Sequence, residues 1–108
     1  SRLILPETNQ AAVFAALGDE TRLALVKRLQ AGPTSIVSLT GNANMSRQAV
    51  TKHLHVLEKA GLVTCARFGR TTVWQLERPK FEHARHYLDI ISQQWDGTLE
   101  RLRAHVEN

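Results

Sequence analysis

Residues 45–63 read MSRQAVTKHLHVLEKAGLV, and this stretch decides the fold. Ser46 is a typical helix N-cap and Gly61 is typical of the position just beyond a helix end, so we expect a helix over 47–60. Three apolar residues recur at helical spacing and predict one buried face: Val50, Leu54 and Leu57. The opposite face carries hydrogen-bonding side chains and no large apolar residue: Arg47, Gln48, Thr51, Lys52 and His55.

Upstream of this helix, glycine and proline divide the chain into short helical segments. An Ala-rich helix is expected over 9–17, and Asp19 is a good N-cap for a second helix over 20–30. The predicted buried stripe of the second helix is Leu23, Leu25, Val26 and Leu29. Thr34 or Ser35 caps a third, short helix, and 41–44 is a turn by composition. Residues 35–60 therefore read as a helix-turn-helix.

Downstream of the helix, two β-branched or aromatic runs cover 62–67 and 71–76, and Phe68-Gly69-Arg70 separates them. This pattern predicts a two-stranded hairpin with a basic tip, or wing, over 62–76, which Pro79 closes. A long helix follows over 80–106, and Gly97 is a candidate position for a bend in it. Its apolar residues step by three or four: Phe81, Ala84, Leu88, Ile91, Trp95, Leu99, Leu102 and Val106. The expected fold class is mainly α with a small β-hairpin, as one winged helix-turn-helix domain over 1–108.

The positive charge is concentrated in the middle of the chain. The 108 residues carry a formal net charge of +4, from 14 Lys and Arg against 10 Asp and Glu. Residues 45–78 hold six of the basic side chains but only Glu58 and Glu77 of the acidic ones. The six are Arg47, Lys52, Lys59, Arg67, Arg70 and Arg78. This excess suits a polyanionic partner, although a solvated basic face would give the same balance.

Several classes of protein do not fit the composition. No apolar run approaches the ~18 residues of a membrane span, and the opening residues 1–6 are too short for a secretory signal. Cys65 is the one cysteine and cannot form an internal disulfide, so we expect a cytoplasmic protein. There is no Gly-rich phosphate loop, and the acids and histidines are scattered, so we expect no enzyme and no cofactor.

A helix with a polar, basic outer face fits the major groove of double-stranded DNA. Arg47 suits a bidentate contact with guanine and Gln48 one with adenine, while Thr51 suits a thymine methyl group or a phosphate. Lys52 and His55, together with Ser46 and the helix N-terminus, are expected to meet phosphates. The predicted contacts of the wing, with an adjacent minor groove or the backbone, come from Arg67, Gly69 and Arg70.

Three stretches resemble the ArsR/SmtB family of bacterial winged-helix repressors: FAALGDETRLALVKRL (14–29), MSRQAVTKHLHVLEKAGLV (45–63) and RFGRTTVWQL (67–76). Together they span most of residues 10–78. The resemblance implies a homodimeric repressor that binds an inverted-repeat operator and releases it on a signal. It also implies that the terminal helices, 9–17 and 80–106, form the dimer interface. The expected interface residues are Val13, Phe14, Leu88, Ile91, Trp95, Leu99 and Leu102.

The chain departs from the metal-sensing members of that family. Ser35-Ile36-Val37 stands where those sensors carry a Cys-Val-Cys box, and the chain has no Asp-x-His pair. His83 and His86 lie three apart on one helix and are workable metal ligands, but two ligands do not make a site. The resemblance is therefore to the branch without the usual metal motifs, and we expect no bound metal.

Plainer or different roles stay open for several features. His53 suits a packing position or a phosphate contact, and Cys65 suits either a small buried residue or a redox sensor. His83 and His86, or Cys65, would serve a metal- or redox-responsive repressor. A winged-helix module that binds another protein and no DNA is the alternative from a different class.

Overall fold

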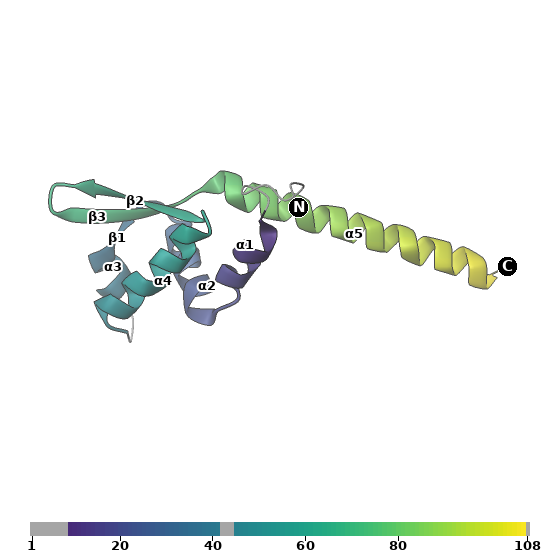
Figure 1. Ribbon diagram of the computed structural model, residues 1–108, viewed down its shortest axis with the longest axis horizontal. Helices are drawn as coiled ribbons and strands as arrows, with labels where there is room; N and C mark the ends of the chain where they lie inside the picture. Colours follow the sequence, from purple (N-terminus) through teal and green to yellow (C-terminus); the bar gives the residue numbers. More distant parts are fainter. Residues whose placement is uncertain (1–8, 42–44, 108) are drawn as a thin grey trace.

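Helices and strands alternate along residues 9–41 and 45–107, the part of the chain that the computed structural model describes (Figure 1). Within these ranges lie α1 (Gln10–Leu17), α2 (Glu20–Leu29), β1 (Thr34–Ser35), α3 (Ile36–Gly41), α4 (Arg47–Lys59), β2 (Val63–Phe68), β3 (Thr71–Leu76) and α5 (Arg78–Glu107). Mainly helical structure with a small antiparallel sheet confirms the expected fold class. The predicted turn over 41–44 lies largely outside the described residues.

Helix α4 begins and ends at the residues that the sequence indicates. The Ser46 hydroxyl accepts a hydrogen bond from the Ala49 N–H at 3.2 Å, as an N-cap does. At the other end, Gly61 has φ +81°, and the next residue, Leu62, donates its N–H to the Leu57 carbonyl at 3.0 Å. This closing bond needs a left-handed residue at position 61, which favours glycine.

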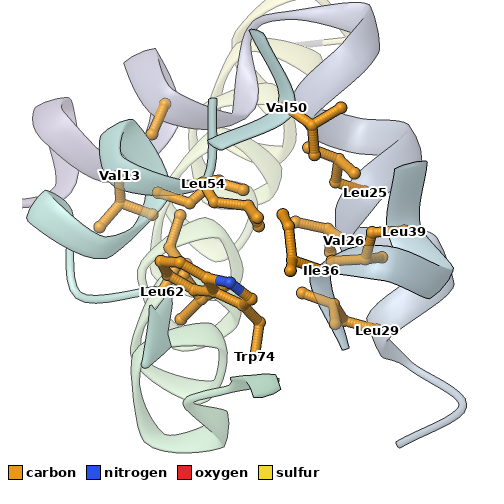
Figure 2. Packing of buried hydrophobic residues seen from close by; sticks show 14 residues of the cluster. Val13, Leu25, Val26, Leu29, Ile36, Leu39, Val50, Leu54, Leu62 and Trp74 are labelled. Carbon is orange, nitrogen blue, oxygen red and sulfur yellow. The ribbon is translucent and has the colours of Figure 1, made fainter. Parts of the chain in front are cut away.

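The core forms around the apolar face of α4. Val50, Leu54 and Leu57 are at most 1% exposed. Figure 2 shows Leu54 and Val50 facing side chains that come from the other helices and from the sheet. The other buried members of this cluster are Val13, Ala16, Leu25, Val26, Leu29, Ile36, Leu39, Leu62, Val63, Trp74 and Ala84. Every helix and the sheet therefore contribute to one core, which sets the position of α4.

The sheet differs from the expected hairpin in two ways. It has three strands in the order β1-β3-β2, because Thr34 and Ser35 pair with Trp74 and Val73. A two-residue strand gives no periodic signal in the sequence, so it was missed. The hairpin loop is also shorter than expected, since Phe68 still pairs with Thr71. Only Gly69 and Arg70 form the turn, with Gly69 at φ +64°, as tight hairpin turns require.

Helix α5 is longer and more continuous than expected. It begins at Arg78, so Pro79 lies in its first turn, where a missing N–H costs no helical hydrogen bond. It also runs through Gly97 as one uninterrupted helix, so the prediction of a bend at this position was wrong (Figure 1). Thirty residues correspond to a rod about 45 Å long, most of which projects from the body of the protein. None of the helices in the described ranges is long and apolar enough to cross a membrane.

The predicted stripe of α2 needs one correction. Leu25, Val26 and Leu29 are buried, but Leu23 is 50% exposed, since it points away from the side of α2 that meets α4. Leu23 and Leu54 are therefore a matched pair, one outside and one inside the core.

Replacing Leu54 by alanine should lower the free energy of unfolding by about 2–5 kcal/mol, because it leaves a cavity in the centre of the core. Leu23→Ala removes the same atoms from an exposed site and should cost less than about 1 kcal/mol. Urea denaturation followed by circular dichroism measures both. Equal losses for the two variants would contradict the described core.

Candidate nucleic-acid interface

The outward face of α4 carries most of the predicted base-reading residues. Arg47, Gln48 and Lys52 are exposed, and Thr51 between them is half-buried. Within the described ranges, neither Arg47 nor Lys52 forms an ion pair with an acidic side chain. Both positive charges therefore point outward without an acidic partner among the described residues. Such side chains can contact phosphates and base edges without first breaking an ion pair within the protein.

The amino end of α4 adds backbone donors to this face. Ser46 is exposed and caps the helix, so its hydroxyl oxygen already accepts the Ala49 N–H. The positive end of the helix dipole lies here, beside Arg47. A phosphate placed at this end would meet partial positive charge, N–H groups and a guanidinium together.

His55 lies further along α4 and is engaged within the chain. Its Nδ1 is 3.1 Å from a carboxylate oxygen of Glu58, and its ring meets the Trp74 ring edge-on at a centroid distance of 5.7 Å. The carboxylate brings negative charge to this end of the helix. His55 therefore has only its other ring nitrogen free for a phosphate, and its role in DNA binding stays a prediction.

The wing carries its basic residues at the end of the sheet. Arg67, Gly69 and Arg70 are exposed, and the Arg67 guanidinium donates to the Gly69 carbonyl across the turn at 3.4 Å. Phe68 lies between them and is 66% exposed, a large apolar surface that sequence reasoning did not single out. Figure 1 shows this tip at one end of the molecule and the free end of α5 at the other.

Two arginines of α2 brace the neighbouring helices, and sequence reasoning missed both. Arg28 donates to the Ser38 and Leu39 carbonyls at the end of α3, at 2.9 and 3.1 Å. Arg22 donates to the Ala16 carbonyl at the end of α1, at 2.6 Å. The partners of both arginines lie on other helices, so only the tertiary structure shows them.

The residues expected at a dimer interface fall into two groups. Leu88, Ile91, Trp95, Leu99 and Leu102 are between 44% and 60% exposed along α5. Phe14 is half-buried, and its ring lies 6.2 Å from the Tyr87 ring, which joins α1 to α5. Val13 is 2% exposed and points into the core, so including it in the interface was wrong. Its neighbour Phe14 is rotated by about 100° around α1. It lies at the edge of the core, half-buried and packed against it.

The candidate ligand residues lie apart from the basic face. His83 and His86 line a hollow of about 380 Å³ between α1 and α5, with Gln10, Tyr87 and Ile90. Across residues 9–41 and 45–107, no group of three or more His, Cys, Asp or Glu side chains is placed so that it could hold a metal ion.

Cys65 is exposed on β2, with its sulfur 3.9 Å from a Glu58 carboxylate oxygen.

Comparisons with known proteins agree with this geometry. Residues 17–66 match a family model described as a helix-turn-helix domain. The uncharacterized HTH-type transcriptional regulator YuzN of Bacillus subtilis is 40% identical over 60% of this chain and 78% of its own length. The HTH-type transcriptional regulator Rv2034 of Mycobacterium tuberculosis is 42% identical over 59% of this chain and 60% of its own length.

A solved structure extends the likeness to nearly the whole chain. An ArsR-like transcriptional regulator from Rhodococcus sp. RHA1 superposes with a TM-score of 0.78 and is 34% identical, covering 90% of each chain. Sequence and fold thus agree over the helix-turn-helix, the wing and much of the terminal helices. The chain therefore belongs to the ArsR family of winged helix-turn-helix transcriptional regulators.

Proposed function

We propose that the protein is a homodimeric repressor that reads an inverted-repeat operator with α4 and the wing of each subunit. The observation that carries this proposal is the positive charge on the outward faces of α4 and the wing, where Arg47, Lys52 and Arg70 form no ion pair with any residue that the structure describes. On α4 the opposite side of the helix is buried in the core, so its charged side is held in place. The proposed setting is the cytoplasm of a bacterium.

Base recognition is assigned to the first turns of α4. Arg47 presents a fork of donors that suits guanine O6 and N7, and Gln48 presents a donor and an acceptor that suit adenine. Thr51 lies one turn further along the same face and is only half-buried, which leaves its methyl or hydroxyl group accessible. Backbone contacts are assigned to Ser46, Lys52 and His55, which set the depth and register of α4 in the groove.

The wing is assigned to the flanking backbone or minor groove. Arg70 is one of the two turn residues and Arg67 lies two positions before the turn, so both charges are near the tip of the hairpin. The Gly69 backbone is exposed and lacks a side chain, which allows a close approach to the sugar-phosphate backbone. Contacts of this kind add affinity for DNA of any sequence and make binding dependent on salt.

The projecting part of α5 supports dimer formation. Its exposed apolar residues recur every three or four positions from Leu88 to Val106, over several turns that the other described residues leave uncovered. Monomeric proteins rarely expose a continuous apolar stripe of this length. A second copy that covers α5 and Phe14 would relate the two α4 helices by a two-fold axis. An inverted repeat with half-sites about one helical turn, or a small multiple, apart follows from that symmetry.

Repression follows from occupancy of a promoter by such a dimer. A dimer bound over the promoter of a gene would exclude RNA polymerase, and control of its own gene would make it an autorepressor. The family consists of transcriptional regulators, so membership in it agrees with the expectation that the protein is not an enzyme. The alternative, a protein-binding module without a DNA site, would leave the unpaired charges on α4 unexplained.

A redox-responsive variant of the proposal depends on Cys65. Partial desolvation raises the pKa of the Cys65 thiol, and the neighbouring Glu58 carboxylate raises it further. Oxidation and alkylation proceed through the thiolate, so a raised pKa makes this cysteine a slow sensor. The geometry thus favours a release signal other than oxidation of Cys65.

Replacing Arg47 or Gln48 by alanine should weaken operator binding by about 1–3 kcal/mol each and relax the preference at one base pair per half-site. Arg70→Ala should instead weaken binding to all DNA and lower the slope of log K against log salt by about 0.9. Lys59→Ala, at the far end of α4, is the control and should keep the affinity. Fluorescence anisotropy on the chain's own promoter and on random DNA measures all four. Equal wild-type affinity for both DNAs would contradict specific recognition.

Replacing Trp95 by aspartate should give a folded monomer, because a charge in the stripe prevents the two α5 helices from packing while leaving the core intact. Gln93→Asp, on the opposite side of the same helix, is the matched control and should remain a dimer. Sedimentation equilibrium gives the oligomeric state, and circular dichroism gives the helix content. A Trp95→Asp variant that sediments as a dimer would rule out the proposed interface.

Iodoacetamide should alkylate Cys65 more slowly at neutral pH than it alkylates a free cysteine peptide. Glu58→Gln should speed the reaction, because removing the carboxylate lowers the pKa of the thiol and raises the thiolate fraction. Glu77→Gln changes a carboxylate that instead accepts from Thr64 at 2.9 Å and should leave the rate unchanged. Mass spectrometry of the modified peptide follows the rate. Faster alkylation than the free peptide would show that Cys65 is poised to react.

A further inference from the structure

Arg22 joins three helices at one point behind the recognition face. Its Nε donates to the Ala16 carbonyl at 2.6 Å, and one terminal nitrogen lies 3.5 Å from the Ala15 carbonyl, both in the last turn of α1. Its other terminal nitrogen is 3.2 Å from Nδ1 of His53 in the middle of α4. All three guanidinium nitrogens are therefore used within the chain.

The chemistry of this contact selects one tautomer of His53. A guanidinium can only donate, so the hydrogen bond requires that Nδ1 of His53 accept, with the ring proton on Nε2. The carboxylate of Asp19 accepts the backbone N–H of Arg22 at 3.0 Å and lies 3.9 Å from the same Nδ1. The positive charge of Arg22 is thus placed between the carbonyl end of α1, which has negative partial charge, and a neighbouring carboxylate.

The position of His53 on α4 gives this bond a mechanical consequence. His53 lies between Lys52, on the outward face, and Leu54, in the core, so its side chain leaves the helix on the flank. Apolar packing of Leu54 holds α4 down but has little directional preference. A hydrogen bond from the flank has a direction, and it therefore limits rotation of α4 about its own axis.

We propose that Arg22 and His53 form a clasp that sets the rotation of α4 against the α1–α2 corner, so that operator affinity depends on two residues that do not touch DNA. The inference rests on the proposed function of α4. Side chains on a helix reach base edges only within hydrogen-bonding distance and angle, so a small rotation misplaces Arg47 and Gln48 together. The clasp also ties α4 to α1, which carries Phe14 of the proposed dimer interface.

The tests use substitutions that separate the two ring nitrogens of His53. Asparagine places an acceptor near the position of Nδ1, whereas glutamine places its amide near Nε2. His53→Asn should bind the operator within about threefold of wild type, while His53→Gln and Arg22→Met should each bind about tenfold more weakly. The double variant Arg22→Met with His53→Gln should be no weaker than either single variant, since both remove the same bond.

The salt dependence distinguishes a clasp from a phosphate contact. The slope of log K against log salt should stay unchanged in Arg22→Met and His53→Gln, because neither residue neutralises a phosphate. A slope lower by about 0.9 would assign the residue to the DNA backbone and overturn the proposal. Additive losses in the double variant, or equal binding by His53→Asn and His53→Gln, would overturn it as well.

A measurement without DNA separates the clasp from the proposed function. In the ¹⁵N spectrum of the free wild-type protein, Nδ1 of His53 should appear as an unprotonated acceptor and Nε2 as protonated, and Arg22→Met should shift Nδ1. A His53 ring protonated at Nδ1 in the wild-type protein near neutral pH would overturn the clasp even if the operator is bound. A wild-type protein with the expected spectrum and no preference for its promoter would instead overturn the proposed function and with it the role of the clasp in DNA binding.

Discussion

Burial of one face of α4 is the constraint on which the rest of the structure depends. Val50, Leu54 and Leu57 are removed from water by residues of all the other helices and of the sheet. Burying each such side chain contributes about 1.5–3 kcal/mol, so the helix cannot turn these residues outward. The polar and basic residues at the intervening positions must then face solvent. The recognition surface is thus a geometric consequence of the core.

The remaining elements either support α4 or carry the surface proposed for association with a second copy. Asp19 and Ser46 cap α2 and α4, and Arg28 holds the end of α3, so the short helices are fixed at their ends as well as along their apolar faces. Helix α5 contributes Ala84 to this core and then leaves it, with a long apolar stripe exposed. The wing and the projecting part of α5 that carries the apolar stripe lie at different ends of the molecule (Figure 1), one suited to a polyanion and the other to a second copy.

Much of this fold could be predicted because the decisive signals are local. The cap at Ser46, the glycine at 61 and the spacing of Val50, Leu54 and Leu57 act within one helix, and each appears as the sequence indicates. The features that were missed depend on distant partners. Strand β1 exists because Thr34 and Ser35 meet β3, and Leu23 is exposed because of where α4 crosses α2. Val13 and Phe14 have similar sequence signals, and only the tertiary structure separates the fully buried residue from the half-buried one beside it.

The same distinction holds for the site. The outward residues of α4 follow from periodicity. In contrast, Arg22, which contacts His53, lies 31 positions away in the chain, and Trp74, which contacts His55, belongs to β3, so neither leaves a local trace. The sequence also gives no geometry for a second subunit. We expect α4 to place Arg47 on guanine in the major groove.

Methylation protection by dimethyl sulfate, which reacts at guanine N7 in the major groove, tests this claim most directly. On the chain's own promoter, the account predicts guanine protection in two half-sites on one face of the duplex, lost from both in Arg47→Ala. Protection that is absent, or that persists unchanged in the variant, would contradict it.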